Sequence, residues 1–164
     1  FKSNVMDKGL ICDASKKLRL ISINLFEGHL KRINTLPEKG ELGQQLKLAV
    51  KSERLQLSSS EQYNEILRVF AELGVRVVLA SPVPEEEPTP LFQIEAVYQI
   101  DYEINGSIGK PAIDEFVKYN AVHHVWPFWR QYVFSLANQS GLPCPEIPLN
   151  TSLQSLDELR VDSV

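Results

Sequence analysis

The sequence has few cysteines, and this limits the class of protein it can encode. Among its 164 residues only Cys12 and Cys144 are cysteines, too few for the disulfide framework of a small secreted domain. We expect two reduced thiols in a cytoplasmic protein. A bridge between them is the less favoured alternative.

Long apolar runs and clustered cations are also missing. No apolar run approaches the roughly 20 residues that span a bilayer as a helix, so no membrane insertion is predicted. The net charge is −4, with Lys and Arg scattered along the chain. A nucleic-acid-binding surface needs clustered cations, so we predict no nucleic-acid partner.

Sequence motifs of common enzymes and metal sites are absent as well. The chain has no glycine-rich phosphate loop, nucleophile elbow or paired-cysteine zinc motif. His123 and His124 are adjacent and would point about 100° apart on a helix, which disfavours joint metal binding. Cys144 lies between two prolines with no neighbouring cation to activate it. We therefore predict a non-enzyme with no catalytic residues, no metal site and no cofactor.

In two stretches every second residue is apolar, from Leu67 to Leu79 and from Phe92 to Ile104. This period of two predicts long strands with one apolar face. For the first we predict a strand over about 65–80 with a bulge at Gly74, against an alternative helix capped by Ser58 and Glu61. The Pro- and Glu-rich link between the two stretches predicts an exposed hairpin loop.

Weaker patterns predict the remaining elements. Residues 18–25 are expected to be a strand that is bulged or buried on both faces, and 46–51 a short amphipathic strand. One helix is predicted after Pro111, and a second from Pro127 to Ser140 with Gly141 as its C-cap. Three prolines keep 142–149 extended. We expect one domain over 10–150, an N-terminal extension or tag remnant over 1–9, and a polar tail over 151–164.

The second predicted helix carries more large aromatic side chains than one face can hold. At about 100° per residue, Trp126, Trp129 and Val133 share one side, and Phe128, Tyr132 and Leu136 form a neighbouring stripe. One stripe can pack on the sheet. The other needs a partner chain or a bound polypeptide.

The most specific passage of the sequence lies in this helix and just after it. It reads Val125-Trp126-Pro127-Phe128-Trp129-Arg130, then Ser135-Leu136, then Gly141-Leu142-Pro143. It resembles the SecB-like chaperone family, and most closely the branch associated with toxin–antitoxin systems, which favours Trp-Pro at the helix start. Residues 92–96 are similar to the third strand of that family. The resemblance covers about residues 10 to 155.

The resemblance implies an α+β fold, in which a four-stranded antiparallel sheet is followed by two C-terminal helices packed on one face. It also implies a homotetramer built as a dimer of dimers. The side chains expected in the oligomer interface are Phe92, Ile94, Glu95, Ala96, Trp126 and Trp129.

The function implied by the resemblance is that of an ATP-independent holdase. It would bind non-native polypeptides, in protein export or in a toxin–antitoxin system, through grooves lined by Phe128, Tyr132, Phe134, Leu142, Pro143, Ile147 and Leu149. The family's export chaperone is strongly acidic and docks the export motor through carboxylates on its sheet. This chain is only mildly acidic, which favours the toxin–antitoxin branch. Alternatives are a dedicated binder of one antitoxin or partner peptide, and a small-ligand-binding protein that is not a chaperone.

Overall fold

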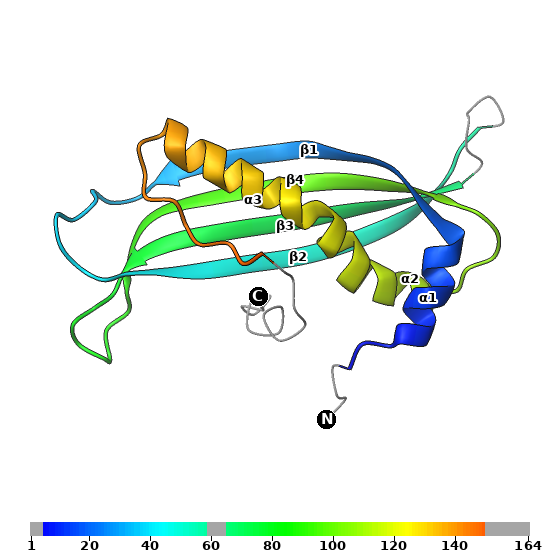
Figure 1. The fold of residues 1–164 in the computed structure, drawn as a ribbon, viewed down its shortest axis with the longest axis horizontal. Coiled ribbons are helices and arrows are strands. Elements are labelled where there is room, and N and C mark those ends of the chain that lie inside the picture. The colour runs from blue at the N-terminus through cyan, green and yellow to red at the C-terminus, as the bar shows by residue number, and fades with distance from the viewer. Residues whose placement is uncertain (1–4, 59–64, 150–164) are drawn as a thin grey trace. The chain divides into compact units, whose positions relative to one another are not determined.

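A computed structural model describes residues 5–58 and 65–149 (Figure 1). In chain order its elements are α1 (Lys8–Lys17), β1 (Leu18–Arg32), β2 (Leu42–Gln56), β3 (Glu65–Leu79), β4 (Thr89–Ile104), α2 (Lys110–Phe116), the π-helical segment η1 (Val117–Ala121) and α3 (Val122–Gln139). The strands form one sheet in the order β1-β4-β3-β2, so β1 and β2 are its edges. The predicted fold class, a four-stranded antiparallel sheet followed by helices, is confirmed.

Contacts divide the chain into two compact units, each containing part of every strand. The first comprises Phe1–Leu25, Val50–Ala71 and Tyr98–Val125, and the second comprises Phe26–Ala49, Glu72–Val97 and Trp126–Val164. The predicted tail over 151–164 lies outside the described residues. No helix in the described part of the chain is long and apolar enough to cross a membrane.

The two central strands follow the predicted alternation. In β3 the odd-numbered residues from Leu67 to Val77 are buried, and in β4 the even-numbered residues from Phe92 to Ile104 are buried. The strand prediction for this region is therefore confirmed over the described residues; Glu61, half of the alternative capping box, lies outside them. The burial pattern keeps its phase through Gly74, so the bulge predicted there is wrong.

The edge strands are longer than predicted, with 15 residues each. Most of their side chains are exposed or half-buried, and Phe26 of β1 is 62% exposed. The alternative in which β1 is buried on both faces is therefore wrong. An edge strand with little buried surface leaves only a weak periodic signal, which is why the sequence underestimates its length.

Helix α1 was not predicted. It begins directly after Asp7, whose carboxylate accepts hydrogen bonds from the main-chain N–H groups of Gly9 and Leu10 at 3.0 and 3.1 Å. Asp is one of the preferred N-cap residues. This cap was the sequence signal that could have revealed the helix.

The C-terminal helices form one continuous run of helical elements, and the prediction that a helix starts at Pro127 is wrong. Pro127 lies inside α3. A proline in a helix interior costs about 3 kcal/mol. Trp126 and Trp129, on either side of it, are 4% and 1% exposed, and burial of large side chains contributes roughly 1.5–3 kcal/mol each. This burial offsets the cost of the proline.

In the first unit, a buried aromatic cluster joins β4 to the helical elements, and an ion pair joins β3 to β4. The Tyr102 ring meets the Phe116 ring edge-on at 5.0 Å, and its hydroxyl lies 2.8 Å from Nδ1 of His124. Burial raises the pKa of Tyr102 and lowers the pKa of His124. Arg68 binds both carboxylate oxygens of the buried Asp101 at 2.9 Å. A buried carboxylate needs such a partner.

The end of α3 follows the sequence prediction. Gly141 has φ +62°, the N–H of Leu142 donates to the Ala137 carbonyl at 2.9 Å, and the N–H of Gly141 donates to the Asn138 carbonyl at 3.2 Å. These two bonds form a Schellman motif. The motif turns the chain sharply, so that residues 142–149 run back beside α3 (Figure 1).

The variant Gly141→Ala tests this turn. An L-residue with a side chain costs about 1–2 kcal/mol in the left-handed region, so we expect the free energy of unfolding to fall by about 1 kcal/mol. Gly43→Ala in β2 is the matched control, because its added Cβ would meet Val78 at an ordinary 3.4 Å. Urea denaturation measures both variants, and equal effects would contradict the assignment.

Candidate functional site

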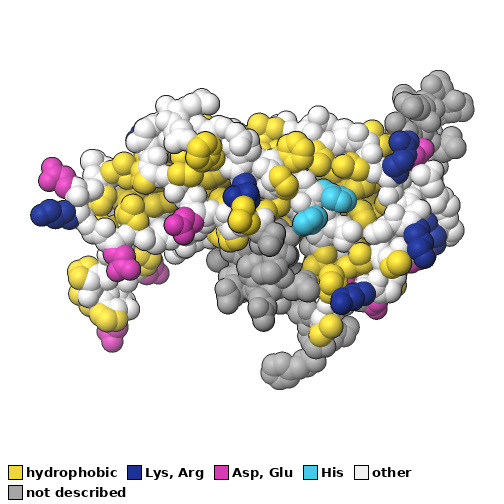
Figure 2. Space-filling view, in the orientation of Figure 1, with side chains coloured by type: hydrophobic (Ala, Val, Ile, Leu, Met, Phe, Trp, Pro, Cys, Tyr) yellow, Lys and Arg dark blue, Asp and Glu magenta, His cyan; other side chains and the backbone are white. Residues whose placement is uncertain are grey.

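In the second unit, helix α3 has one buried side and two exposed aromatic side chains. Trp129, Val133 and Ala137 recur every four residues and are at most 1% exposed. Phe128 and Phe134, in contrast, are 51% and 55% exposed. Figure 2 shows apolar side chains on the surface along the helix. The division into a packed stripe and a second stripe matches the sequence prediction, with Tyr132 and Leu136 half-buried.

Tyr132 lies over a glycine of β1. A Cβ added to Gly28 would lie 2.3 Å from the Tyr132 hydroxyl oxygen and 2.9 Å from the ring carbon that bears it. The Tyr132 ring also stacks on Trp129, with centroids 6.2 Å apart. Burial raises the pKa of Tyr132. Gly28 therefore provides the space that lets this side of α3 approach β1.

Residues 142–149, here called the strap, are extended, as predicted. Leu142 and Pro145 are buried, and Ile147 is half-buried. Pro143, Pro148 and Leu149 are exposed, Leu149 by 75%. Of the predicted groove residues in the strap, Pro143, Ile147 and Leu149 thus offer apolar surface to a ligand, and Leu142 is part of the core.

Side chains from β2 and α3 hold the main chain of the strap. The Gln44 amide accepts from the N–H of Glu146 at 2.9 Å and donates to its carbonyl at 2.5 Å. Arg130 Nε donates to the Ile147 carbonyl at 3.2 Å, and Trp126 Nε1 donates to the Pro148 carbonyl at 2.7 Å. Sequence reasoning missed Gln44 and Arg130, because nothing in the local sequence indicates a bond to a segment 102 residues away from Gln44 or 17 residues away from Arg130.

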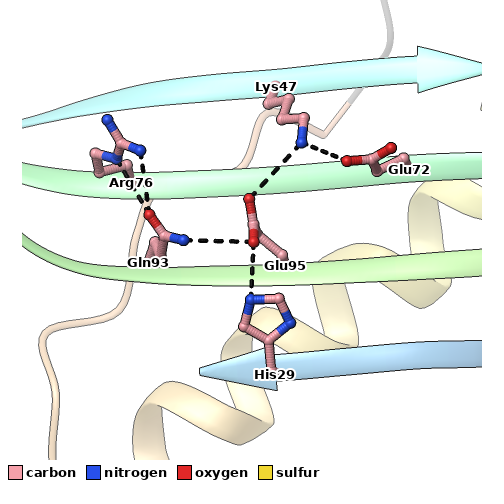
Figure 3. A network of polar contacts seen from close by, with 6 residues as sticks. All are labelled: His29, Lys47, Glu72, Arg76, Gln93 and Glu95. Atoms are coloured by element: carbon pink, nitrogen blue, oxygen red, sulfur yellow. Dashed lines mark hydrogen bonds and ion pairs between the residues drawn. The ribbon is translucent and has the colours of Figure 1, made fainter. Parts of the chain in front are cut away.

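Glu95 belongs to a polar network on the sheet, and its side chain points to the face opposite Ile94 and Ala96 (Figure 3). Its carboxylate lies 2.8 Å from His29 Nε2 and 3.8 Å from Lys47 Nζ. Lys47 also pairs with Glu72, and that hydrogen bond raises the pKa of Lys47. Because the network places cations beside carboxylates, their opposite charges largely cancel.

The other residues predicted at an oligomer interface lie in the core. Phe92, Ile94, Ala96, Trp126 and Trp129 are each at most 4% exposed within a single chain. They have almost no side-chain surface left to offer to a second chain. The burial of Phe92, Ile94 and Ala96 follows from the same alternation that predicted the strands, and Trp126 and Trp129 are on the packed side of α3.

Within residues 5–58 and 65–149 we find no group of three or more His, Cys, Asp and Glu side chains placed to hold a metal ion. Every buried side-chain nitrogen and oxygen of these residues has a hydrogen-bond partner. Cys12 and Cys144 are exposed free thiols. The candidate site is thus an apolar surface on α3 beside the strap.

Comparisons with known proteins agree with this geometry at the level of the fold. No protein-family model matches the chain, and neither does any curated protein sequence. Among solved structures, the chain is similar to the Mycobacterium tuberculosis Rv1957 SecB-like chaperone in complex with a ChAD peptide from the Rv1956 HigA1 antitoxin. The TM-score is 0.68 at 9% identity, over 88% of this chain and 99% of that chain. The chain has a SecB-like fold.

The SecB-like fold spans nearly the whole of the matched structure, although so few residues are identical. The sequence resemblance carried by Trp126-Pro127 and Gly141-Leu142-Pro143 therefore identified the right fold. Those residues form the start of the buried stripe of α3 and the turn into the strap, where packing and backbone geometry restrict the choice of residue.

The contact between Gly28 and Tyr132 can be tested by a double-mutant cycle. Gly28→Ala should lower the free energy of unfolding by about 1–3 kcal/mol, because it overpacks the contact. In a Tyr132→Leu background the same substitution should cost little. Urea denaturation of the four proteins gives a coupling energy, expected to exceed about 1 kcal/mol. Additive effects would contradict the contact.

Proposed function

We propose that this chain is an ATP-independent holdase chaperone that binds non-native polypeptide segments. The observation that supports this most is the exposure of Phe128 and Phe134 on α3 of a SecB-like fold. Exposed clusters of large apolar side chains are unfavourable in a folded protein unless they serve binding. Burial of apolar surface is non-directional, so such a surface accepts many sequences.

The proposed binding surface combines α3 and the strap. Phe128 and Phe134 supply aromatic contacts, with Leu149 and Pro143 exposed on the strap. Tyr132, over Gly28 of β1, and Ile147, in the strap bound by Gln44 of β2, are half-buried and would border this surface on opposite sides of α3. These are the residues predicted from the sequence to line the groove, now ordered by how much surface each can offer.

A dedicated binder of one antitoxin segment is the second candidate. It is favoured by the matched solved structure, which holds a peptide from an antitoxin. The polar network on the sheet also favours a toxin–antitoxin role over export. Its carboxylates Glu72 and Glu95 are paired with Lys47, which leaves less free negative charge for docking an export motor.

We also propose that the chain forms a homo-oligomer through the β1 edge, as part of a dimer of dimers. A long edge strand is prone to pair with another strand, and β1 carries Leu25 and Phe26, which are 49% and 62% exposed. This edge has the solvent-exposed apolar surface that the buried residues Phe92, Ile94 and Trp129 lack. The β1 edge therefore replaces these buried residues as the proposed oligomer interface.

The chaperone proposal predicts that the protein suppresses aggregation of a denatured globular protein, such as citrate synthase, at equimolar amounts. Phe128→Gln with Phe134→Gln should weaken binding at least tenfold, because two half-exposed rings together contribute on the order of 2 kcal/mol when they are buried. Light scattering of the client measures suppression, and fluorescence anisotropy measures affinity.

The matched control is Asn138→Ala, an exposed polar position on the same helix, which should leave suppression unchanged. No suppression by the wild-type protein would contradict a general holdase. Tight binding of one antitoxin peptide together with no affinity for unfolded proteins would establish the dedicated binder instead.

The interface proposal predicts that Phe26→Lys raises the dissociation constant of the oligomer at least tenfold, because a desolvated charge on the edge opposes strand pairing. Phe26→Leu keeps the apolar character and should preserve assembly. Multi-angle light scattering over a concentration series measures the mass. A wild-type monomer at micromolar concentration would overturn this assignment.

A further inference from the structure

The strap is held in the way that a protein holds a bound extended peptide. Four hydrogen bonds join Gln44, Arg130 and Trp126 to the main chain of three consecutive residues, Glu146 to Pro148. All four hydrogen bonds involve main-chain groups of the strap, so they do not depend on which side chains the strap carries. Main-chain hydrogen bonds of this kind are the general means by which extended peptides are captured.

The apolar anchoring of this part of the strap is slight. Pro145 is buried and Ile147 is half-buried, whereas Glu146, Pro148 and Leu149 are exposed. The strap also carries three prolines, which restrict its backbone and lower the conformational entropy that it gains on release. The four polar contacts are the part of its anchoring that any other extended chain could make in its place.

The strap lies next to the surface proposed for client binding. Arg130 lies four residues before Phe134 on α3, so these two side chains share one side of the helix. A polypeptide that places a side chain on the Phe134 ring would bring its main chain close to the Arg130 donor and, next to it on the same side of α3, the Trp126 donor. The donors are then within reach of a second extended chain, provided that the strap leaves.

We propose that residues 146–148 occupy the main-chain-binding part of the client site, and that an extended segment of a non-native polypeptide displaces them to accept hydrogen bonds from Trp126 and Arg130. This inference rests on the proposed chaperone function. It makes the strap from Glu146 onward a competitor of the client. The affinity for the client then depends on the difference between the free energies with which the client and the strap bind the same donors.

The test changes the strap and leaves its receptor residues intact. Glu146→Pro removes the N–H that donates to Gln44 and places a ring carbon where that hydrogen bond was. Glu146→Ala keeps the N–H and changes only the side chain, so it is the matched control. The probe is reduced and carboxymethylated α-lactalbumin, which stays unfolded, and its affinity is measured by fluorescence anisotropy.

We expect Glu146→Pro to bind the probe about tenfold more tightly than the wild-type protein, because losing one hydrogen bond weakens the competing occupant by about that factor. Glu146→Ala should stay within about twofold of the wild type. Unchanged or weaker binding by Glu146→Pro would overturn the proposal.

Hydrogen exchange supplies a direct readout in the wild-type protein. The Glu146 amide, protected by Gln44, should exchange at least about tenfold faster when the probe is saturating. Slower exchange would show that the client packs over the strap, and would overturn displacement while keeping the chaperone function.

If neither the wild-type protein nor any variant binds the probe, the proposed chaperone function itself fails. A rise in oligomer mass with unchanged affinity would identify a second copy as the occupant and overturn the proposal.

Discussion

The burial of one face of α3 is the interaction on which the rest of the second unit depends. Trp129, Val133 and Ala137 lie every four residues along this face and are essentially inaccessible to solvent. The fixed rotation of the helix then decides the position of every other side chain. Phe128 and Phe134 must point away from the packed face, Tyr132 must lie over Gly28, and Trp126 and Arg130 must reach the strap.

The central strands impose a similar constraint on the sheet. Because residues alternate between its faces, burying Ile94 and Ala96 leaves Glu95 on the opposite face, where it meets His29 and Lys47. One face of the sheet is thus apolar and the other carries paired charges. The exposed aromatic rings of the second unit, and the side-chain donors of Trp126 and Arg130 that bind the main chain of the strap, are all on α3.

Sequence reasoning succeeded where a pattern is local and strong. The alternation of β3 and β4, the two stripes of α3, and the turn at Gly141 were all predicted, because each follows from residues close together in the chain. It failed at Pro127, where burial of Trp126 and Trp129 outweighs a strong helix-breaking tendency. It also underestimated β1 and β2, whose exposed side chains give little periodic signal.

By itself, the sequence determined that this protein has two long central strands, an amphipathic aromatic helix and an extended proline-containing segment after it. The tertiary structure alone decided that Trp126 and Trp129 belong to the core, that Tyr132 packs over Gly28, and that the Gln44 side chain is hydrogen-bonded to the main chain of Glu146. The physical reason is that periodicity and turn chemistry act between near neighbours in the chain. Burial and hydrogen bonding depend on which distant segments the fold brings together.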